Sequence, residues 1–314
     1  MKAILGNIKL RYLTLLMVFT TCAVCLSACA KGASDASKSS VGGNLATSQT
    51  SSAKAGSDIK AVALSKSTGD LWLLAGGKLI GITEDGLDLD GIGDVTSIGT
   101  VSKPNLEAIL SLEPDLVLLS GELSSHREIK EKCDEAGIKT ISVTENSFDD
   151  YSKIMKELTD LTGHPENYTK NVTDVSDEID DICKKVDQKS GKTYLAIRVS
   201  ASKNKALKND YFACDIFNDL GLTNVVTDDS ELEDLSLEWI ADVNPDYIFA
   251  VPMGDEEEAL DGLKKSFESQ PVWKELNAVK SDKVFVMPKD LFQYKPNASW
   301  AEAYKYAYGL IYDK

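Results

Sequence analysis

The sequence predicts an α/β protein of two similar lobes that one long helix joins. The first observation is an internal repeat: residues 105–121, NLEAILSLEPDLVLLSG, align without a gap with residues 236–252, SLEWIADVNPDYIFAVP. Each copy reads as a short amphipathic helix, a Pro-Asp turn that cannot continue it, and an apolar run that suits a buried parallel strand. A repeat at this spacing indicates two related lobes.

Strand and helix patterns alternate in both halves of the chain, as they do in a parallel sheet covered by helices. The stretches predicted as strands are residues 59–64, 79–82, 116–119 and 140–143 in the first half, and 193–199, 224–226, 247–251 and 283–287 in the second. Between the halves no strand is expected. Residues 166–186 instead place Val172, Val175, Ile179 and Ile182 on one helical face, which predicts a stiff connection between the lobes.

Residues 1–28 predict a signal peptide, because Lys2, Lys9 and Arg11 precede an apolar run that is too short to span a membrane. The run ends in LSA before Cys29, which resembles the lipobox of bacterial lipoproteins and implies lipidation of Cys29. A plain secretory signal with an incidental cysteine is the alternative. Residues 29–58 are rich in Ser, Ala and Gly and predict a flexible tether.

The domain organisation that follows is a lipoprotein signal peptide at 1–28, a lipidated tether at 29–58, a first lobe at 59–165, a connecting helix at 166–188 and a second lobe at 189–314. Beyond the signal and the lipobox, Cys133, Cys183 and Cys214 form no CxxC pair. We interpret them as small core residues, two of which could form one disulfide.

Composition narrows the function classes. The formal net charge of −16 argues against a nucleic-acid partner. The sequence holds no GxSxG or HExxH motif, so no enzyme is predicted. With two histidines far apart, no site for direct capture of zinc or manganese is predicted either.

Three segments carry a resemblance to a known family: PNLEAILSLEPDLVLLS at 104–120, LSLEWIADVNPDYIFAV at 235–251 and PVWKELNAVKSDKVFVMPKDLF at 271–292. They resemble the substrate-binding lipoproteins of ABC importers for iron-siderophores, haem and cobalamin, and the likeness runs from about residue 59 to the C-terminus. The resemblance implies two Rossmann-like lobes joined by one backbone helix, with the ligand held in the cleft between them, no cofactor, and no chemistry done on the ligand.

The resemblance also implies partners and a place in the cell. It predicts a monomer, lipid-anchored on the extracytoplasmic face of the cell membrane, that binds a small metal chelate and serves a dimeric ABC permease with its ATPase. The tether and the lack of a secure disulfide favour a Gram-positive surface over a periplasm. In the family a glutamate near the start of the motif helix of each lobe docks onto permease arginines, and Glu107 and Glu238 hold those positions. The alternative is that glutamate simply favours a helix N-terminus.

Ligands of open α/β lobes bind beyond the carboxyl ends of the strands. This rule nominates the stretches 65–68, 101–103, 120–127, 200–212, 251–254 and 292–295, together with Leu232. The predicted ligand-binding residues are Lys66, Ser67, Thr68, Val101, Ser102, Lys103, Ser120, His126, Arg127, Arg198, Lys205, Tyr211, Met253, Phe292, Tyr294 and Lys295.

The predicted cargo is an iron complex, with a ferric siderophore placed first. Arg198 lies near the carboxyl end of an apolar strand, where a planar guanidinium would suit a carboxylate or catecholate, although it could equally pair with a neighbouring acid. Haem is an alternative, with His126, Tyr211, Met253 or Tyr294 as the axial ligand. Cobalamin-binding relatives place tryptophans near Val101, Ser120 and Leu232, and none of these is aromatic here. The rival function is a surface module that presents a ligand to a sensor.

Overall fold

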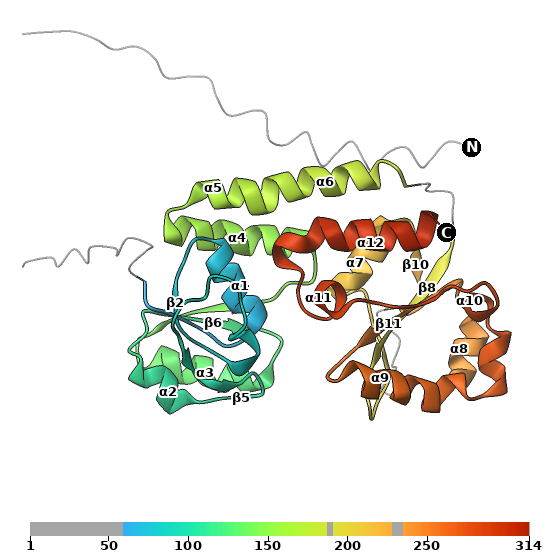
Figure 1. Ribbon diagram of the computed structural model, residues 1–314, viewed down its shortest axis with the longest axis horizontal. Coiled ribbons are helices and arrows are strands. Elements are labelled where there is room, and N and C mark those ends of the chain that lie inside the picture. Colours follow the sequence, from blue (N-terminus) through green and yellow to red (C-terminus); the bar gives the residue numbers. More distant parts are fainter. Residues whose placement is uncertain (1–58, 187–190, 228–234, 314) are drawn as a thin grey trace, which may run out of the picture. The chain divides into compact units, whose positions relative to one another are not determined.

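The apolar strands of the first half form a parallel sheet in the order β3-β2-β1-β6-β7 (Figure 1). The computed structural model describes residues 59–186, 191–227 and 235–313, all of which belong to one compact unit. The predictions for the signal peptide, the tether, Cys29 and Leu232 lie outside these residues. The strands are β1 (Ala61–Ala63), β2 (Leu79–Ile82), β3 (Thr96–Ser97), β6 (Leu116–Ser120) and β7 (Lys139–Val143).

Helices cover both faces of this sheet because alternate strand residues point to opposite sides. On one side, Ala61 and Leu118 pack in a cluster with Trp72 and Tyr151. On the other side, Val117 packs with Ile109 and Ile129. The helices are α1 (Lys66–Leu74), α2 (Leu106–Ser111), α3 (Ser124–Glu135) and α4 (Phe148–Thr162). A short helical turn, η2 (Glu84–Gly86), and a hairpin of β4 (Gly99–Thr100) and β5 (Lys103–Pro104) lie between β2 and α2.

The second half repeats the plan with a parallel sheet in the order β10-β8-β11-β12, to which β9 adds an antiparallel edge. Its strands are β8 (Thr193–Val199), β9 (Lys205–Ala206), β10 (Thr223–Asn224), β11 (Tyr247–Pro252) and β12 (Val284–Val286). Its helices are α7 (Phe212–Asp219), α8 (Leu237–Val243), α9 (Glu256–Leu263), η4 (Lys264–Glu268), η5 (Pro271–Glu275), α10 (Asn277–Lys280), α11 (Lys289–Phe292), η6 (Asn297–Ser299) and α12 (Trp300–Tyr312).

The predicted connecting helix begins with α5 (Pro165–Tyr168), passes through one π-helical turn, η3 (Thr169–Thr173), and ends with α6 (Asp174–Cys183). Its apolar stripe is buried as predicted, and α6 packs against α12 (Figure 1). The domain limits remain predictions, and the limit at residue 189 falls among residues 187–190, outside the described ranges. Cys133, Cys183 and Cys214 are free, so the disulfide left open by the sequence is not formed.

The two copies of the repeat fold alike. Asn105 and Ser236 cap α2 and α8 by accepting hydrogen bonds from Ala108 N (3.1 Å) and Trp239 N (3.2 Å). In the turn that follows, Glu113 and Asn244 both adopt a positive φ, of 47° and 40°. Such a left-handed residue ends each helix and directs the chain into its proline. The repeat found in the sequence is therefore a repeat of local geometry.

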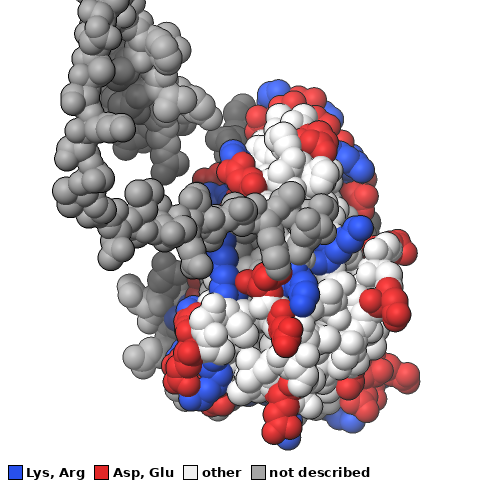
Figure 2. All heavy atoms as spheres, turned by 90° about the vertical axis from the view of Figure 1, so that its left-hand side faces the viewer, with Lys and Arg blue, Asp and Glu red and all other residues white. Residues whose placement is uncertain are grey.

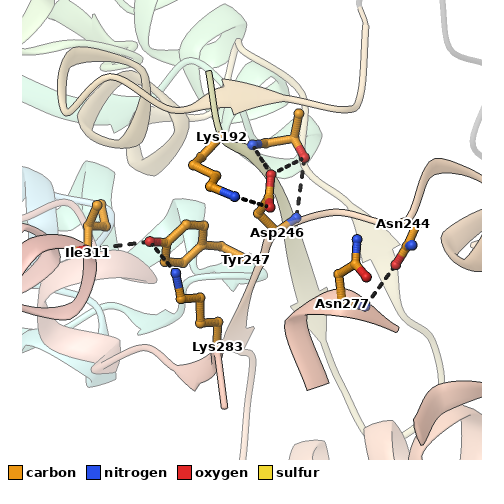
Figure 3. Close-up of polar contacts among 8 residues, drawn as sticks. Lys192, Asn244, Asp246, Tyr247, Asn277, Lys283 and Ile311 are labelled. Atoms are coloured by element: carbon orange, nitrogen blue, oxygen red, sulfur yellow. Dashed lines mark hydrogen bonds and ion pairs between the residues drawn. The ribbon is translucent and has the colours of Figure 1, made fainter. Parts of the chain in front are cut away.

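The turn aspartates fasten each repeat to its sheet. Asp115 accepts a hydrogen bond from Lys60 N at 3.0 Å, and Asp246 accepts one from Thr193 N at 2.9 Å and pairs with Lys192 Nζ at 2.9 Å (Figure 3). Burial raises the pKa of Asp246, but the bonds from Thr193 and Lys192 outweigh burial and leave this pKa below its usual value. The matching position of the aspartate in the two copies thus has a structural cause.

The distribution of charged side chains on one face of the molecule is consistent with the acidic net charge of the sequence. On the face drawn in Figure 2, acidic and basic side chains are interspersed rather than gathered into a basic field. That face offers no electrostatic track for a phosphate backbone. Within the described ranges, none of the helices has the length and apolar character needed to cross a membrane.

Candidate functional site

The carboxyl ends of the strands of both sheets open onto one pocket of about 510 Å³. The first lobe supplies the residues that follow β1, β6 and β7, and the second lobe supplies those that end β8 and follow β11. The lining consists of Ser65, Ser67, Thr68, Asp85, Val101, Ser120, Glu122, Leu123, Val143, Glu145, Arg198, Tyr211, Met253, Gly254, Gln293, Tyr294 and Lys295. This is the place that the strand-end rule predicts for a ligand.

Many of the predicted residues lie in this wall: Ser67, Thr68, Val101, Ser120, Arg198, Tyr211, Met253, Tyr294 and Lys295. Asp85, Val143 and Glu145 lie there too, although no nominated stretch contained them. Val143 ends β7 and Glu145 follows it, so the same rule, applied to the fourth strand of the first half, would have found both. Asp85 lies in η2, shortly after the predicted strand 79–82, so the rule applied to that strand would have reached it as well.

The other predicted residues do not line this pocket: Lys66, Ser102, Lys103, His126, Arg127, Lys205 and Phe292. Lys66 points to Asp88, with which it forms an ion pair at 2.9 Å. Phe292 is fully buried and packs parallel to Phe217 with the ring centroids 5.9 Å apart, so it belongs to the core. Lys103, Arg127 and Lys205 are exposed, and Ser102 lines a neighbouring hollow.

His126 was expected in a cleft loop, and this expectation is wrong. It lies in the first turn of α3 and is fully buried. Its Nδ1 accepts a hydrogen bond from Ser120 N at 3.0 Å, and its Nε2 donates to Val101 O at 3.0 Å. Burial lowers the pKa of His126, which keeps the ring neutral. Both ring nitrogens are therefore used to hold two residues of the pocket wall, and neither is available to coordinate iron.

Arg198 brings a positive charge to the second lobe's side of the pocket. Its guanidinium carbon lies 5.3 Å from the centre of the Tyr211 ring, and its Nε is buried without a hydrogen-bond partner. Among the described residues, no acid forms an ion pair with it, which disfavours the reading that it pairs with a neighbouring carboxylate. A buried donor without an acceptor is costly, and a ligand oxygen in the pocket would satisfy it.

A C-terminal segment, residues 293–300, carries further polar groups from the second lobe to the first. Lys295 Nζ donates to Glu122 Oε1 at 2.8 Å and to the carbonyl of Glu145, while Asn297 Nδ2 donates to Asp70 Oδ2 at 2.7 Å. Gln293 Oε1 is buried and has no partner. The segment thus closes one wall of the pocket and leaves a second unsatisfied polar atom beside it.

Glu145 is a buried carboxyl group in the wall of the first lobe. Its Oε1 accepts a hydrogen bond from Trp300 Nε1 at 3.1 Å, and its Oε2 has no partner. Burial raises the pKa of Glu145 to about 7, although the nearby Lys295 ammonium acts in the opposite direction. At neutral pH this group therefore exchanges between a neutral donor and a charged acceptor.

The raised pKa of Glu145 predicts a loss of stability as the pH rises. The folded protein holds this proton more tightly than the unfolded chain, so the contribution is complete below the ordinary pKa near 4.5 and is lost by about pH 7. It amounts to roughly 3 kcal/mol. Thermal unfolding followed by circular dichroism at pH 5 and pH 8 measures it, and Glu145→Gln should reduce the difference between the two melting temperatures.

Glu131→Gln, at an exposed position on α3, is the matched control and should keep the wild-type pH dependence. Asp215, whose pKa burial raises to about 6, acts with the same sign and remains in both variants. A Glu145→Gln protein that loses as much stability as the wild type would contradict the assignment.

A larger hollow, of about 710 Å³, lies on the second lobe between α9, η4, η5 and β12. Its lining includes Leu260, Lys264, Trp273, Val284 and Val286, all from this one lobe. Within the described part of the chain, its lining contributes no buried polar atom that lacks a partner. The smaller pocket, which both lobes build and which holds unsatisfied polar atoms, is therefore the better candidate for ligand binding.

Comparison with known proteins agrees with this arrangement. The chain is 32% identical over 196 residues to the iron-uptake system-binding protein of Bacillus subtilis, an alignment that spans 61% of this chain and 61% of that relative, which is less than two thirds of its length. It is 25% identical over 226 residues to the high-affinity heme uptake system protein IsdE of Staphylococcus aureus, which covers 70% of this chain and 75% of that one.

The fold is that of an ABC transporter substrate-binding protein from Listeria monocytogenes, with a TM-score of 0.70 and 24% identity over 82% of this chain and 99% of the other. The fold prediction of two α/β lobes is thereby confirmed. The family model described as periplasmic binding protein matches residues 65–291, which include most of the pocket wall. The chain therefore belongs to the periplasmic binding protein family.

Proposed function

We propose that the protein captures a small iron complex, a ferric siderophore first of all, and delivers it to an ABC permease. The observation that carries the proposal is the buried Nε of Arg198, which has no partner and belongs to a pocket lined by both lobes. The oxygen ligands that surround ferric iron in a siderophore are acceptors that a guanidinium recognises well. The iron-uptake system-binding protein of B. subtilis supports an iron cargo by its similarity.

Haem is the second candidate, favoured by two lining residues that can coordinate iron. Met253 and Tyr294 both line the pocket, and a thioether or a phenolate can serve as an axial haem ligand. The similarity to the heme uptake protein of S. aureus supports this alternative. Because His126 is committed to the pocket wall, haem binding would rest on these two residues or on Tyr211.

The proposed partner is a dimeric permease with its ATPase, contacted through one glutamate of each lobe. Glu107 and Glu238 are exposed and lie in the first turns of α2 and α8, which belong to different lobes (Figure 1). Exposed carboxylates suit docking onto arginines. We further propose that lipid on Cys29 and the tether of residues 29–58 hold a monomer at the extracytoplasmic face of the membrane, as the sequence predicts.

Titration of the purified full-length chain in detergent tests the cargo. Trp300 donates a hydrogen bond to Glu145, a lining residue, so its fluorescence should respond when the pocket fills. We expect saturable quenching with one equivalent of a ferric siderophore, and weaker or no response to haemin and cyanocobalamin. A response to cyanocobalamin alone would contradict the proposal.

A further inference from the structure

The pocket wall carries an uneven distribution of charge. Among the described residues, the acids that line it are Asp85, Glu122 and Glu145, which come from the first lobe. The cations of the wall are Arg198 and Lys295, which come from the second lobe and from the C-terminal segment. A cargo that spans the pocket therefore meets carboxyl groups on one side and basic groups on the other.

The cation on the C-terminal segment is already neutralised within the protein. Lys295 Nζ lies 2.8 Å from Glu122 Oε1, and only 17% of the lysine side chain is exposed. Its remaining hydrogen bond goes to the carbonyl of Glu145. Of the two cations in the wall, Arg198 is thus the one left to meet charge on the cargo.

Asp85 in η2, by contrast, forms no ion pair with any lysine or arginine in the part of the chain that the structure describes. Asp85 Oδ1 accepts from the Thr83 hydroxyl at 2.6 Å, and Oδ2 accepts from Lys66 N at 2.9 Å. Both donors are neutral groups, so these bonds hold the carboxylate in place without cancelling its charge. Its position in the wall then disfavours a negative group on any ligand nearby.

A second hollow of about 600 Å³ extends the pocket along the first lobe, because the two share Asp85, Val101 and Leu123. Its lining adds Glu84, Thr100, Ser102, Ser124 and Ser125, and no lysine or arginine of the described ranges belongs to it. A cargo large enough to reach from the pocket into this hollow gains hydroxyl and carboxylate neighbours but no further cation.

We propose that the cargo is a ferric chelate of net charge zero or +1, the class of the ferric trihydroxamates, rather than a ferric triscatecholate of charge −3. The inference rests on the proposed capture of a ferric siderophore and narrows its chemistry. The carboxylates of Asp85 and Glu122 balance Arg198 and Lys295, and Glu84 adds a further negative charge nearby. A triply negative complex would meet one guanidinium that has no acid partner among the described residues, and it would face the carboxylates of Asp85 and Glu84.

Each side of the pocket then has a part in holding a trihydroxamate. Hydroxamate oxygens accept from the free Nε–H of Arg198, and the amide or ammonium groups of the ligand chain donate to the free Oε2 of Glu145. An ammonium group on the ligand also gains from Asp85. Among the described residues, two of the three unsatisfied polar atoms in the wall, Arg198 Nε and Glu145 Oε2, thus find partners in one ligand, and a purely anionic cargo would supply no donor for Glu145.

Isothermal titration of the full-length chain with defined iron chelates tests the inference. The probes are ferrioxamine B, a monocationic trihydroxamate; ferrichrome, a neutral one; ferric enterobactin, a triscatecholate of charge −3; haemin; and cyanocobalamin. We expect a trihydroxamate to bind at least about 100-fold more tightly than ferric enterobactin. Equal or tighter binding of ferric enterobactin would overturn the inference but leave the proposed function standing. Binding of haemin or cyanocobalamin alone would overturn both.

Glu122→Gln separates charge from other causes of selectivity. The Glu122 side chain is 41% exposed, so the variant should fold, and the substitution releases Lys295 from its ion pair. We expect the affinity for ferric enterobactin relative to ferrioxamine B to rise by about 10- to 100-fold. Glu131→Gln makes the same change of charge on an exposed part of α3 and should leave the ratio unchanged. An unchanged ratio in folded Glu122→Gln would also overturn the inference.

Discussion

Replacing Glu107 and Glu238 together with arginine should abolish uptake of the cargo by cells while the purified protein keeps its affinity for the cargo. Both carboxylates are exposed in the first turns of α2 and α8, and neither lines the pocket. Reversing both charges would bring arginine against the proposed arginines of the permease. Like charges in contact at an interface cost several kcal/mol, so we expect uptake to fall by about 100-fold or more.

Uptake of iron-55 delivered as the bound chelate measures this effect, with surface abundance checked by immunoblotting. Glu257→Arg is the matched control, because Glu257 is an exposed glutamate in the first turn of another helix of the second lobe, α9. It should leave uptake unchanged. Intact transport by the doubly reversed protein would exclude these glutamates as the docking residues.

Replacing Arg198 with glutamine should weaken cargo binding by about 100-fold. The substitution removes the one cation of the pocket wall that no carboxylate neutralises among the described residues, together with its buried Nε donor. Loss of a charged hydrogen-bond donor from a desolvated site costs about 2 to 5 kcal/mol. Arg198→Lys should recover part of the loss, since it restores the charge but not the planar guanidinium.

The chain offers a close control for this experiment in Arg127, which is exposed on α3 and lies outside the pocket wall. Arg127→Gln changes the net charge equally and should bind the cargo as the wild type does. Because Arg198 also packs on the Tyr211 ring, the melting temperature of each variant should be measured alongside binding. Wild-type affinity in a folded Arg198→Gln protein would remove Arg198 from the site.

The fold was predictable because its information is local and repeated. About seventeen residues form the helix, Pro-Asp turn and strand of each repeat. In both copies the structure shows a side-chain cap at the start of the helix and a residue of positive φ before the proline. The sequence did not reveal why the turn aspartates match. Each aspartate accepts a hydrogen bond from a residue far away in the chain, as Asp246 does from Thr193, and the two residues meet only in the folded sheet.

The candidate site was predictable in part for the same reason. Strand ends can be read from the sequence, and Ser120, Arg198 and Met253, which they nominated, line the pocket in the structure. The direction of a side chain depends on tertiary packing, which turned His126 inward to bind Ser120 and Val101. Asp85 reaches the wall through η2, whose position depends on contacts with α1 that no local pattern reports.

The most direct test of the account is the position of iron in crystals of the protein with a bound ferric siderophore. Anomalous diffraction at the iron absorption edge locates the metal without reference to the rest of the ligand. We predict one iron peak within the pocket lined by Arg198, Tyr211 and Lys295. A peak in the hollow lined by Leu260, Trp273 and Val286, with none in this pocket, would contradict the central claim.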